Sequence, residues 1–321
     1  MIAYLIRRLI QSFVVFVIVM FFTFILPYFE TGGILAPAYI ALQNHASPSA
    51  VHQWGVTHDI FKPFYVRFWD YFSGVVFHFN LGYSWRQTSS VWGIIKTFVP
   101  RTIWIALASL VLSVIIALPL GILQASKRNT AFDYSVTNVL FVLYGVPAFL
   151  LSLLMITWFS IDSIHLPPVP NGSSSLAIFY DPKAFLLPVA ALTLLNLAFL
   201  SRFMRSAVLD VLVQDYIRTA RAKGCSQMRV LFRHSFRNAL GPIIIILGLF
   251  LPGLFGGALI IEEVFNYEGI GYQTVQAATY LDIPLVLGIT LLTTIMTLAG
   301  NLIADIMLGV VNPRVRVEGR K

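Results

Sequence analysis

Six apolar runs, each near the length that crosses a bilayer, constrain the fold of this 321-residue chain more than any other feature. A membrane-spanning helix needs roughly 20 apolar residues, because each residue rises only about 1.5 Å. The composition agrees, since 58% of the residues are hydrophobic and 11% are charged. The runs are Leu9–Phe29, Thr102–Leu123, Tyr134–Ile161, Phe185–Met204, Ile243–Ile261 and Leu285–Val311.

Lipid offers no hydrogen-bond partner, so every backbone group inside it must be satisfied within the protein. A β-barrel would show short segments of alternating polarity, which this sequence lacks. The sequence therefore predicts an all-α membrane protein with about six transmembrane helices. Four residues inside the runs are expected to kink their helices: Pro119, Gly145, Pro147 and Pro188.

The net charge of +8 reports the topology rather than a nucleic-acid partner. With the N-terminus placed inside, 16 of the 22 Lys and Arg fall on the inner side, in the N-terminus, the 124–133 loop, the 202–238 segment and the residues after 311. Loops with excess Lys and Arg stay in the cytoplasm. Both termini are therefore expected to be cytoplasmic.

The first apolar run could also belong to a cleaved signal peptide. Its length exceeds the usual apolar core of such peptides, and no cleavage-like site follows Phe29. We therefore expect an uncleaved first helix. The single cysteine, Cys225, can form neither an intrachain disulfide nor a cysteine metal cluster.

We expect the chain to divide into an N-terminal transmembrane helix with an extracytoplasmic segment (1–101), a transmembrane core (102–311) and a cytoplasmic tail (312–321). Apolar residues within 63–79 recur with the spacing of one helical face, and Pro63 suits a helix start. This aromatic-rich helix could lie along the membrane interface, pack on the bundle itself or meet an external partner.

Catalytic and metal-binding patterns are missing from the sequence. His45, His52 and His58 lack a helical ligand spacing, and neither a phosphate-binding loop nor a nucleophile elbow is present. Asp305 is unusual because it lies inside the last apolar run, close to Asn301. An intramembrane carboxylate is a functional candidate by default, but Asp305 lies near the inner end of its run, and a structural pairing with a cytosolic arginine is the favoured explanation.

The segment 214–242, QDYIRTARAKGCSQMRVLFRHSFRNALGP, gathers six of the 22 basic residues and a single acid. Asp215 is a suitable helix N-cap and Gly224 a suitable C-terminal stop, which gives a helix of eight residues, about 12 Å long. So short a helix needs tertiary contact. The alternative is a basic stretch held by anionic lipid, but that role requires neither the glycine nor the small residues Ala220 and Ala222.

This segment resembles the cytoplasmic coupling loop of binding-protein-dependent ABC importer permeases, in particular the oligopeptide/dipeptide branch. The resemblance places the coupling loop at residues 205–238. Arg218-Thr219-Ala220 stands where the general motif has Glu-Ala-Ala, and Gly224 matches its glycine. Similarity continues in MIAYLIRRL (residues 1–9), in NLGYS (residues 80–84) and through GALIIEEVFNYEGIGYQTVQAATYLDIPLVLG near the C-terminus.

The chain departs from the family pattern at two places. Arg237 stands where the general motif has proline, the nearest proline being Pro242, and LPYFETGG (residues 26–33) replaces a common Pro-Gly-Asp-Pro element. The second departure lies on the expected outer surface, where the cargo or a binding protein would contact the chain.

The resemblance implies a bacterial or archaeal inner-membrane subunit of an ATP-driven peptide importer. Its expected partners are a second homologous permease, two ABC ATPase subunits and an extracytoplasmic solute-binding protein, within membrane lipid. ATP and Mg would sit on the ATPase subunits, so this chain would hold no cofactor and no catalytic site. The residues expected to couple it to the ATPases are Asp215, Tyr216, Arg218, Thr219, Ala220, Arg221, Ala222, Lys223 and Gly224.

Other functions are weighed against this reading. Related permeases carry oligosaccharides or nickel, and a nickel route would favour His or carboxylates in the spans, where only Asp305 is evident. An intramembrane enzyme would need a second catalytic group beside Asp305. A membrane scaffold would need no capped cytoplasmic helix, and co-purification of an ATPase subunit separates it from a transporter.

Overall fold

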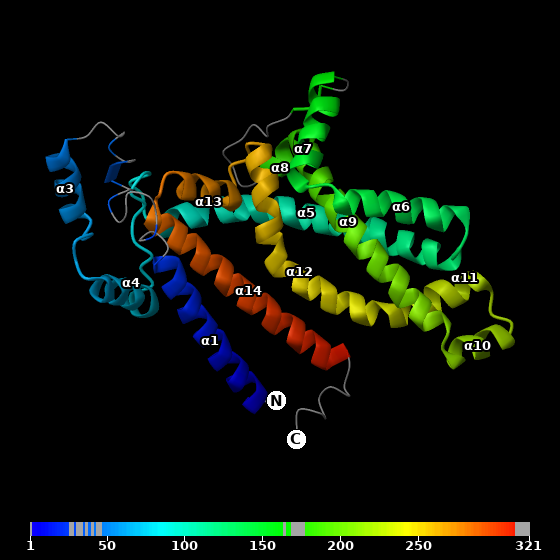
Figure 1. The fold of residues 1–321 in the computed structure, drawn as a ribbon. Coiled ribbons are helices and arrows are strands. Elements are labelled where there is room, and N and C mark those ends of the chain that lie inside the picture. Colours follow the sequence, from blue (N-terminus) through cyan, green and yellow to red (C-terminus); the bar gives the residue numbers. More distant parts are fainter. Residues whose placement is uncertain are drawn as a thin grey trace. The chain divides into compact units, whose positions relative to one another are not determined.

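The computed structural model describes residues 2–25, 47–162, 165–167 and 177–311, together with residues 29, 35, 38, 39 and 42. Among these residues every named element is helical, and the strand-like pairing is one isolated bridge between Tyr83 and Ser90. The predicted all-α class is confirmed (Figure 1). The predicted tail, 312–321, and most of LPYFETGG lie outside the described residues.

The chain forms two compact units, which are described separately. One consists of Met1–Thr102 with Glu268–Leu298, and the other of Ile103–Tyr267 with Ala299–Lys321. The helices of the first unit are α1 (Ile2–Ile25), α3 (Pro48–Thr57), α4 (Phe64–His78), the start of α5 (Val91–Ser126), α13 (Ile270–Thr279) and most of α14 (Ile283–Val311).

Helix α4 is the aromatic-rich helix expected within 63–79. It packs on α1 through edge contacts of Phe21 and Phe24 with Phe64 and Phe68. Of the three positions considered for this helix, the structure shows packing on the bundle, against its first helix. On its outward side Trp69 remains 59% exposed, so α4 also keeps an apolar surface.

Asp282, which lies between α13 and α14, anchors the NLGYS segment. Its buried carboxylate accepts hydrogen bonds from the Ser84 hydroxyl and from the backbone N–H groups of Trp85 (3.0 Å) and Arg86 (3.4 Å). The Arg86 guanidinium lies 3.3 Å from the ring centroid of Tyr280. A buried carboxylate is tolerated when several donors satisfy it, so Asp282 is a structural residue of this unit.

The second unit holds the remaining part of α5, the end of α14 and eight α or π elements that follow one another along the chain. They are α6 (Ala131–Gly145), α7 (Ala148–Ile156), η3 (Thr157–Asp162), α8 (Ala177–Tyr180), α9 (Pro182–Leu212), α10 (Asp215–Ala222), α11 (Gln227–Arg229) and η4 (Val230–Ser235), ahead of α12 (Phe236–Val264).

Helix α9 is the central element of this unit. Its buried residues join two apolar clusters: Leu192 packs in one with Ile105 and Phe265, and Met204 packs in the other with Ile122 and Leu231. Along the described part of the unit, α9 contacts α6, α7 and α12. It therefore positions both the segment that follows it and the helices beside it.

Five described helices are long and apolar enough to cross a membrane, and a bent pair supplies a sixth span. The five are Ile6–Ile25, Val91–Ser126, Pro182–Leu212, Gln227–Gly248 and Ile283–Ile303. The prediction of about six spans is confirmed when the bent pair counts as one. The span Gln227–Gly248 begins earlier than the predicted Ile243 because α11, η4 and α12 form one helical run from Gln227.

The third predicted span, Tyr134–Ile161, is broken rather than gently kinked. Helix α6 ends at Gly145, and α7 starts after Pro147 at an angle of 101°. Proline cannot donate a backbone hydrogen bond and restricts the residue before it, here Val146. By contrast, α5 and α9 run on through Pro119 and Pro188.

Candidate functional site

The chain turns sharply between α9 and α10. The Gln214 N–H donates to the Val211 carbonyl at 3.1 Å, and the Gln214 carbonyl then accepts from the Ile217 N–H at 3.0 Å to start the new helix. Gln214 is thus the N-cap, and Asp215, predicted as the cap, is the first helical residue. Its negative charge in the first turn still interacts favourably with the positive N-terminal end of the helix dipole.

The C-terminal end of α10 is closed by a Schellman motif. The Cys225 N–H donates to the Ala220 carbonyl at 3.2 Å, and the Gly224 N–H donates to the Arg221 carbonyl at 2.9 Å. Gly224 adopts φ +78°, a left-handed conformation that costs glycine little and other residues more. The predicted stop at Gly224 is confirmed, and α10 has the predicted length of eight residues.

One side chain anchors α10. Ile217 is fully buried, and α10 contacts η4, where Val230 and Leu231 are buried as well. Ile217 did not appear among the predicted site residues. The signal for it was present, because it is the one aliphatic residue longer than alanine in the polar run DYIRTARA.

The other side of α10 faces solvent. Tyr216 is 45% exposed, and Thr219, Ala222 and Lys223 are exposed too. Arg218 and Asp215 form a surface ion pair of 3.3 Å, which contributes little to stability. The predicted coupling residues therefore lie on one compact helix and its C-terminal cap. Among the described residues, the outer face of this helix has no partner beyond the ion pair and intrahelical bonds.

An ion pair braces the helix that leads into α10. The Asp133 carboxylate, which is 1% exposed, accepts from Arg205 Nε at 2.8 Å and from Arg205 Nη2 at 2.7 Å. The Asn129 N–H donates to the same carboxylate at 3.1 Å. This bidentate pair joins the start of α6 to the last third of α9 and was not predicted from the sequence.

Gln124 of α5 forms polar contacts with α6 and α9, the two helices that the ion pair joins. The Ser201 hydroxyl donates to Gln124 Oε1 at 3.0 Å, while Gln124 Nε2 donates to Thr137 Oγ1 at 3.2 Å. Close by, a Cβ on Gly121 would lie 2.7 Å from the Ser201 carbonyl, so glycine lets α5 and α9 approach closely. The support of α10 is thus fixed by polar contacts between three helices.

The remaining candidate residues are not brought to this site. Asn301 is half-buried in α14, and the side chain of Asp305 lies outside the described residues. His52 stacks on Phe61, and His58 stacks on Trp54, while His45 lies outside the described residues. In the described part of the chain no three His, Cys, Asp or Glu side chains come together as a metal site.

Comparison with known proteins gives consistent matches along the chain. Residues 117–317 match the family described as "binding-protein-dependent transport system inner membrane component", and residues 1–106 match the N-terminal region of such membrane components. The first match includes α10 and its supports.

Similar proteins carry names from the same class. The chain is 32% identical to the oligopeptide transport system permease protein AppB of Bacillus subtilis, over 98% of this chain and 99% of that one. It is 32% identical to the dipeptide transport system permease protein DppB of Escherichia coli K12, over 79% and 82%. A solved inward-facing structure of the MetNI methionine ABC transporter is 20% identical, covers 67% of this chain and 97% of its own, and gives a TM-score of only 0.46.

Proposed function

The chain belongs to the family of binding-protein-dependent transport system inner membrane components, and from this premise we propose that α10 couples it to ATP-hydrolysing partner subunits. The chain is a transport permease subunit of the inner membrane. The observation that carries the coupling proposal is α10 itself, a capped eight-residue helix with one buried anchor, Ile217, and an exposed outer face.

The mechanism follows from the rigidity of this element. A short helix can transmit movement only when both its ends and its inner face are fixed. The Schellman motif and Ile217 fix α10, and the Asp133–Arg205 pair fixes the helix before it. When two ATPase subunits close around ATP and Mg, a groove that holds α10 would move it and tilt the attached spans.

The peptide cargo of the importer rests on the relatives. Those named for their cargo carry oligopeptides or dipeptides, and this chain shares about a third of its residues with them over most of its length. A second, homologous permease completes the pore in this proposal, and an extracytoplasmic binding protein delivers the cargo. Oligosaccharides are the second cargo candidate and nickel the third.

The orientation in the membrane is part of the proposal. Arg7 and Arg8 lie at the very start of the first span, and the segment from Arg218 to Arg237 is rich in arginine. Both are therefore placed at the cytoplasmic side together with the C-terminus. Under this orientation α10 faces the compartment that contains ATP. The NLGYS segment around Ser84 then faces the binding protein.

A matched pair of substitutions tests the coupling role. Ala222 is exposed on α10, so Ala222→Arg places a bulky cation on the docking face without disturbing the core. We expect it to abolish co-purification of the ATPase subunits and cargo-dependent ATP hydrolysis while membrane insertion stays normal. Ala131→Arg adds the same group at another exposed helical position and should retain both. Normal ATPase binding by Ala222→Arg would refute the proposal.

A further inference from the structure

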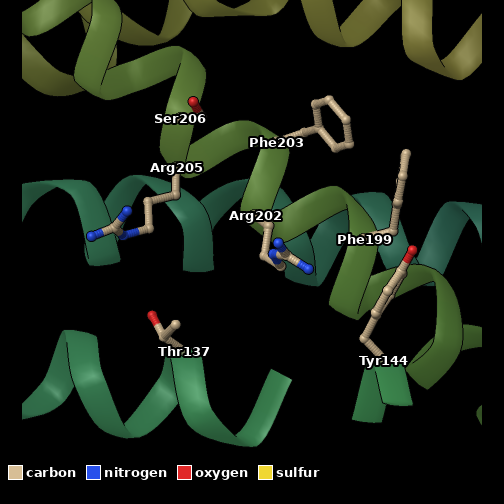
Figure 2. Close-up of a pocket in the computed structure, with 7 residues that line it drawn as sticks. All are labelled: Thr137, Tyr144, Phe199, Arg202, Phe203, Arg205 and Ser206. Atoms are coloured by element: carbon tan, nitrogen blue, oxygen red, sulfur yellow. The ribbon is translucent and has the colours of Figure 1, made fainter. Parts of the chain in front are cut away.

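A pocket of about 600 Å³ lies between α6 and α9, apart from the exposed face of α10. Its volume falls in the range of small-molecule sites, roughly 300–1,000 Å³. In Figure 2, Thr137 and Tyr144 point from α6 toward α9, and Arg202 and Arg205 point from α9 toward α6. The lining residues are Thr137 and Tyr144 from α6 and Phe199, Arg202, Phe203, Arg205 and Ser206 from α9.

The pocket has one cationic group that no carboxylate neutralises. Arg205 is held by both oxygens of Asp133 and is therefore already paired. The Arg202 guanidinium lies 5.5 Å from the ring centroid of Tyr144, and it forms no ion pair with any carboxylate that the structure describes. Arg202 is exposed, so an anionic ligand can reach it without displacing a partner.

The lining changes from apolar to polar along the helix axes. In Figure 2, Phe199 and Tyr144 lie on one side of Arg202, and Thr137 and Arg205 lie on the other. The polar end is the end nearer α10, because α9 runs from Phe199 past Arg205 into the turn at Gln214. A ligand that fits has an anionic head beside Arg202 and an apolar part along the aromatic rings.

The depth of Arg202 in the membrane suits a lipid headgroup. Helix α9 has 31 residues and is about 46 Å long, whereas the hydrocarbon core is about 30 Å thick. Its last third therefore projects beyond the hydrocarbon core when Pro182 lies at the outer boundary. Arg202 stands at the start of that third, ten residues before Leu212.

We propose that this pocket binds an anionic phospholipid of the cytoplasmic leaflet, with the phosphate on Arg202 and an acyl chain along Phe199, Phe203 and Tyr144. Basic pockets between membrane helices at the cytoplasmic face are typical sites for such headgroups. The inference rests on the proposed function for the orientation of α9. A free phosphate or a peptide carboxylate shares the anionic group but lacks the acyl chain that the aromatic end would hold.

Native mass spectrometry of the full-length chain in detergent tests the site. Phosphatidylglycerol and phosphatidylethanolamine with identical acyl chains serve as probes, and we expect tighter binding of phosphatidylglycerol. Arg202→Gln should weaken that binding roughly tenfold, as expected for the loss of one charge-assisted contact. Arg202→Lys should retain most of it, and Arg229→Gln, which removes an exposed arginine outside the pocket, should leave it unchanged.

Three outcomes would overturn the proposal. Equal losses in Arg202→Gln and Arg229→Gln would mean diffuse attraction of lipid to a basic surface. Displacement of the lipid by inorganic phosphate at similar concentration would mean a free-anion site, and displacement by a short peptide would mean a cargo site. The lipid-binding assay contains no ATPase, so a negative result in it does not bear on the docking test with Ala222→Arg. A negative docking result likewise does not bear on lipid binding. Unchanged size-exclusion profiles exclude misfolding.

Discussion

At the scale of single residues, the Asp133–Arg205 pair carries the clearest energetic consequence. Asp133 is 1% exposed, whereas the Arg205 side chain is 28% exposed and partly solvated. Breaking a fully buried pair costs about 3–5 kcal/mol, so we expect Asp133→Asn to destabilise the unit by about 2 kcal/mol. Thermal unfolding of the purified chain, followed by circular dichroism, measures the shift.

A double-mutant cycle supplies the control for this pair. If the two side chains act together, Arg205→Gln and the double variant should each lose about as much stability as Asp133→Asn alone. Strictly additive losses would contradict the pairing. Ser126→Ala, at a half-buried position at the end of α5 where the hydroxyl bonds only to Leu123 of the same helix, should leave the unfolding temperature nearly unchanged.

At the scale of elements, α10 depends on a single buried side chain. An isolated eight-residue helix is marginal in water, so Ile217→Ala should loosen α10 without unfolding the spans. We expect amide exchange across Asp215–Lys223 to rise about tenfold or more, while exchange in α9 is unchanged. Tyr216→Ala, at the neighbouring exposed position, should leave exchange as in the parent chain. Equal amide protection of α10 in Ile217→Ala and Tyr216→Ala would show that a residue other than Ile217 anchors the helix.

The elements were predictable where the signal is local. Apolar runs predict spans, and Gly224 predicts the end of α10, because both features depend on neighbouring residues alone. Its start was predicted one residue late, since Gln214 caps through its backbone carbonyl and Asp215 offered the more familiar capping side chain. The 101° break at Gly145–Pro147 exceeded the expected kink because proline there is preceded by a helix-ending Val146.

Contacts between distant residues were not predictable. Asp133 with Arg205, and Ser84 with Asp282, are separated by 72 and 198 residues. A lone acid beside an apolar run signals only that some partner exists. The choice of partner depends on how the helices pack, which the spacing of residues in one sequence does not specify.

At the scale of the whole molecule, five spanning helices with one bent pair, an inner-membrane transport family and one compact exposed helix describe the permease subunit of a transporter. The proposal assigns ATP hydrolysis to partner subunits, in keeping with a sequence that has no phosphate-binding loop motif. The central claim is that this chain is the permease subunit of an ATP-driven peptide importer.

The most direct measurement reconstitutes the chain in proteoliposomes with its partner permease, the ATPases and the binding protein. We predict that short peptides stimulate ATP hydrolysis and accumulate inside the vesicles, and that Ala222→Arg abolishes both while Ala131→Arg does not. Stimulation by oligosaccharides or nickel without peptides would contradict the cargo. ATP hydrolysis and uptake that are unaffected by Ala222→Arg would contradict the coupling role of α10.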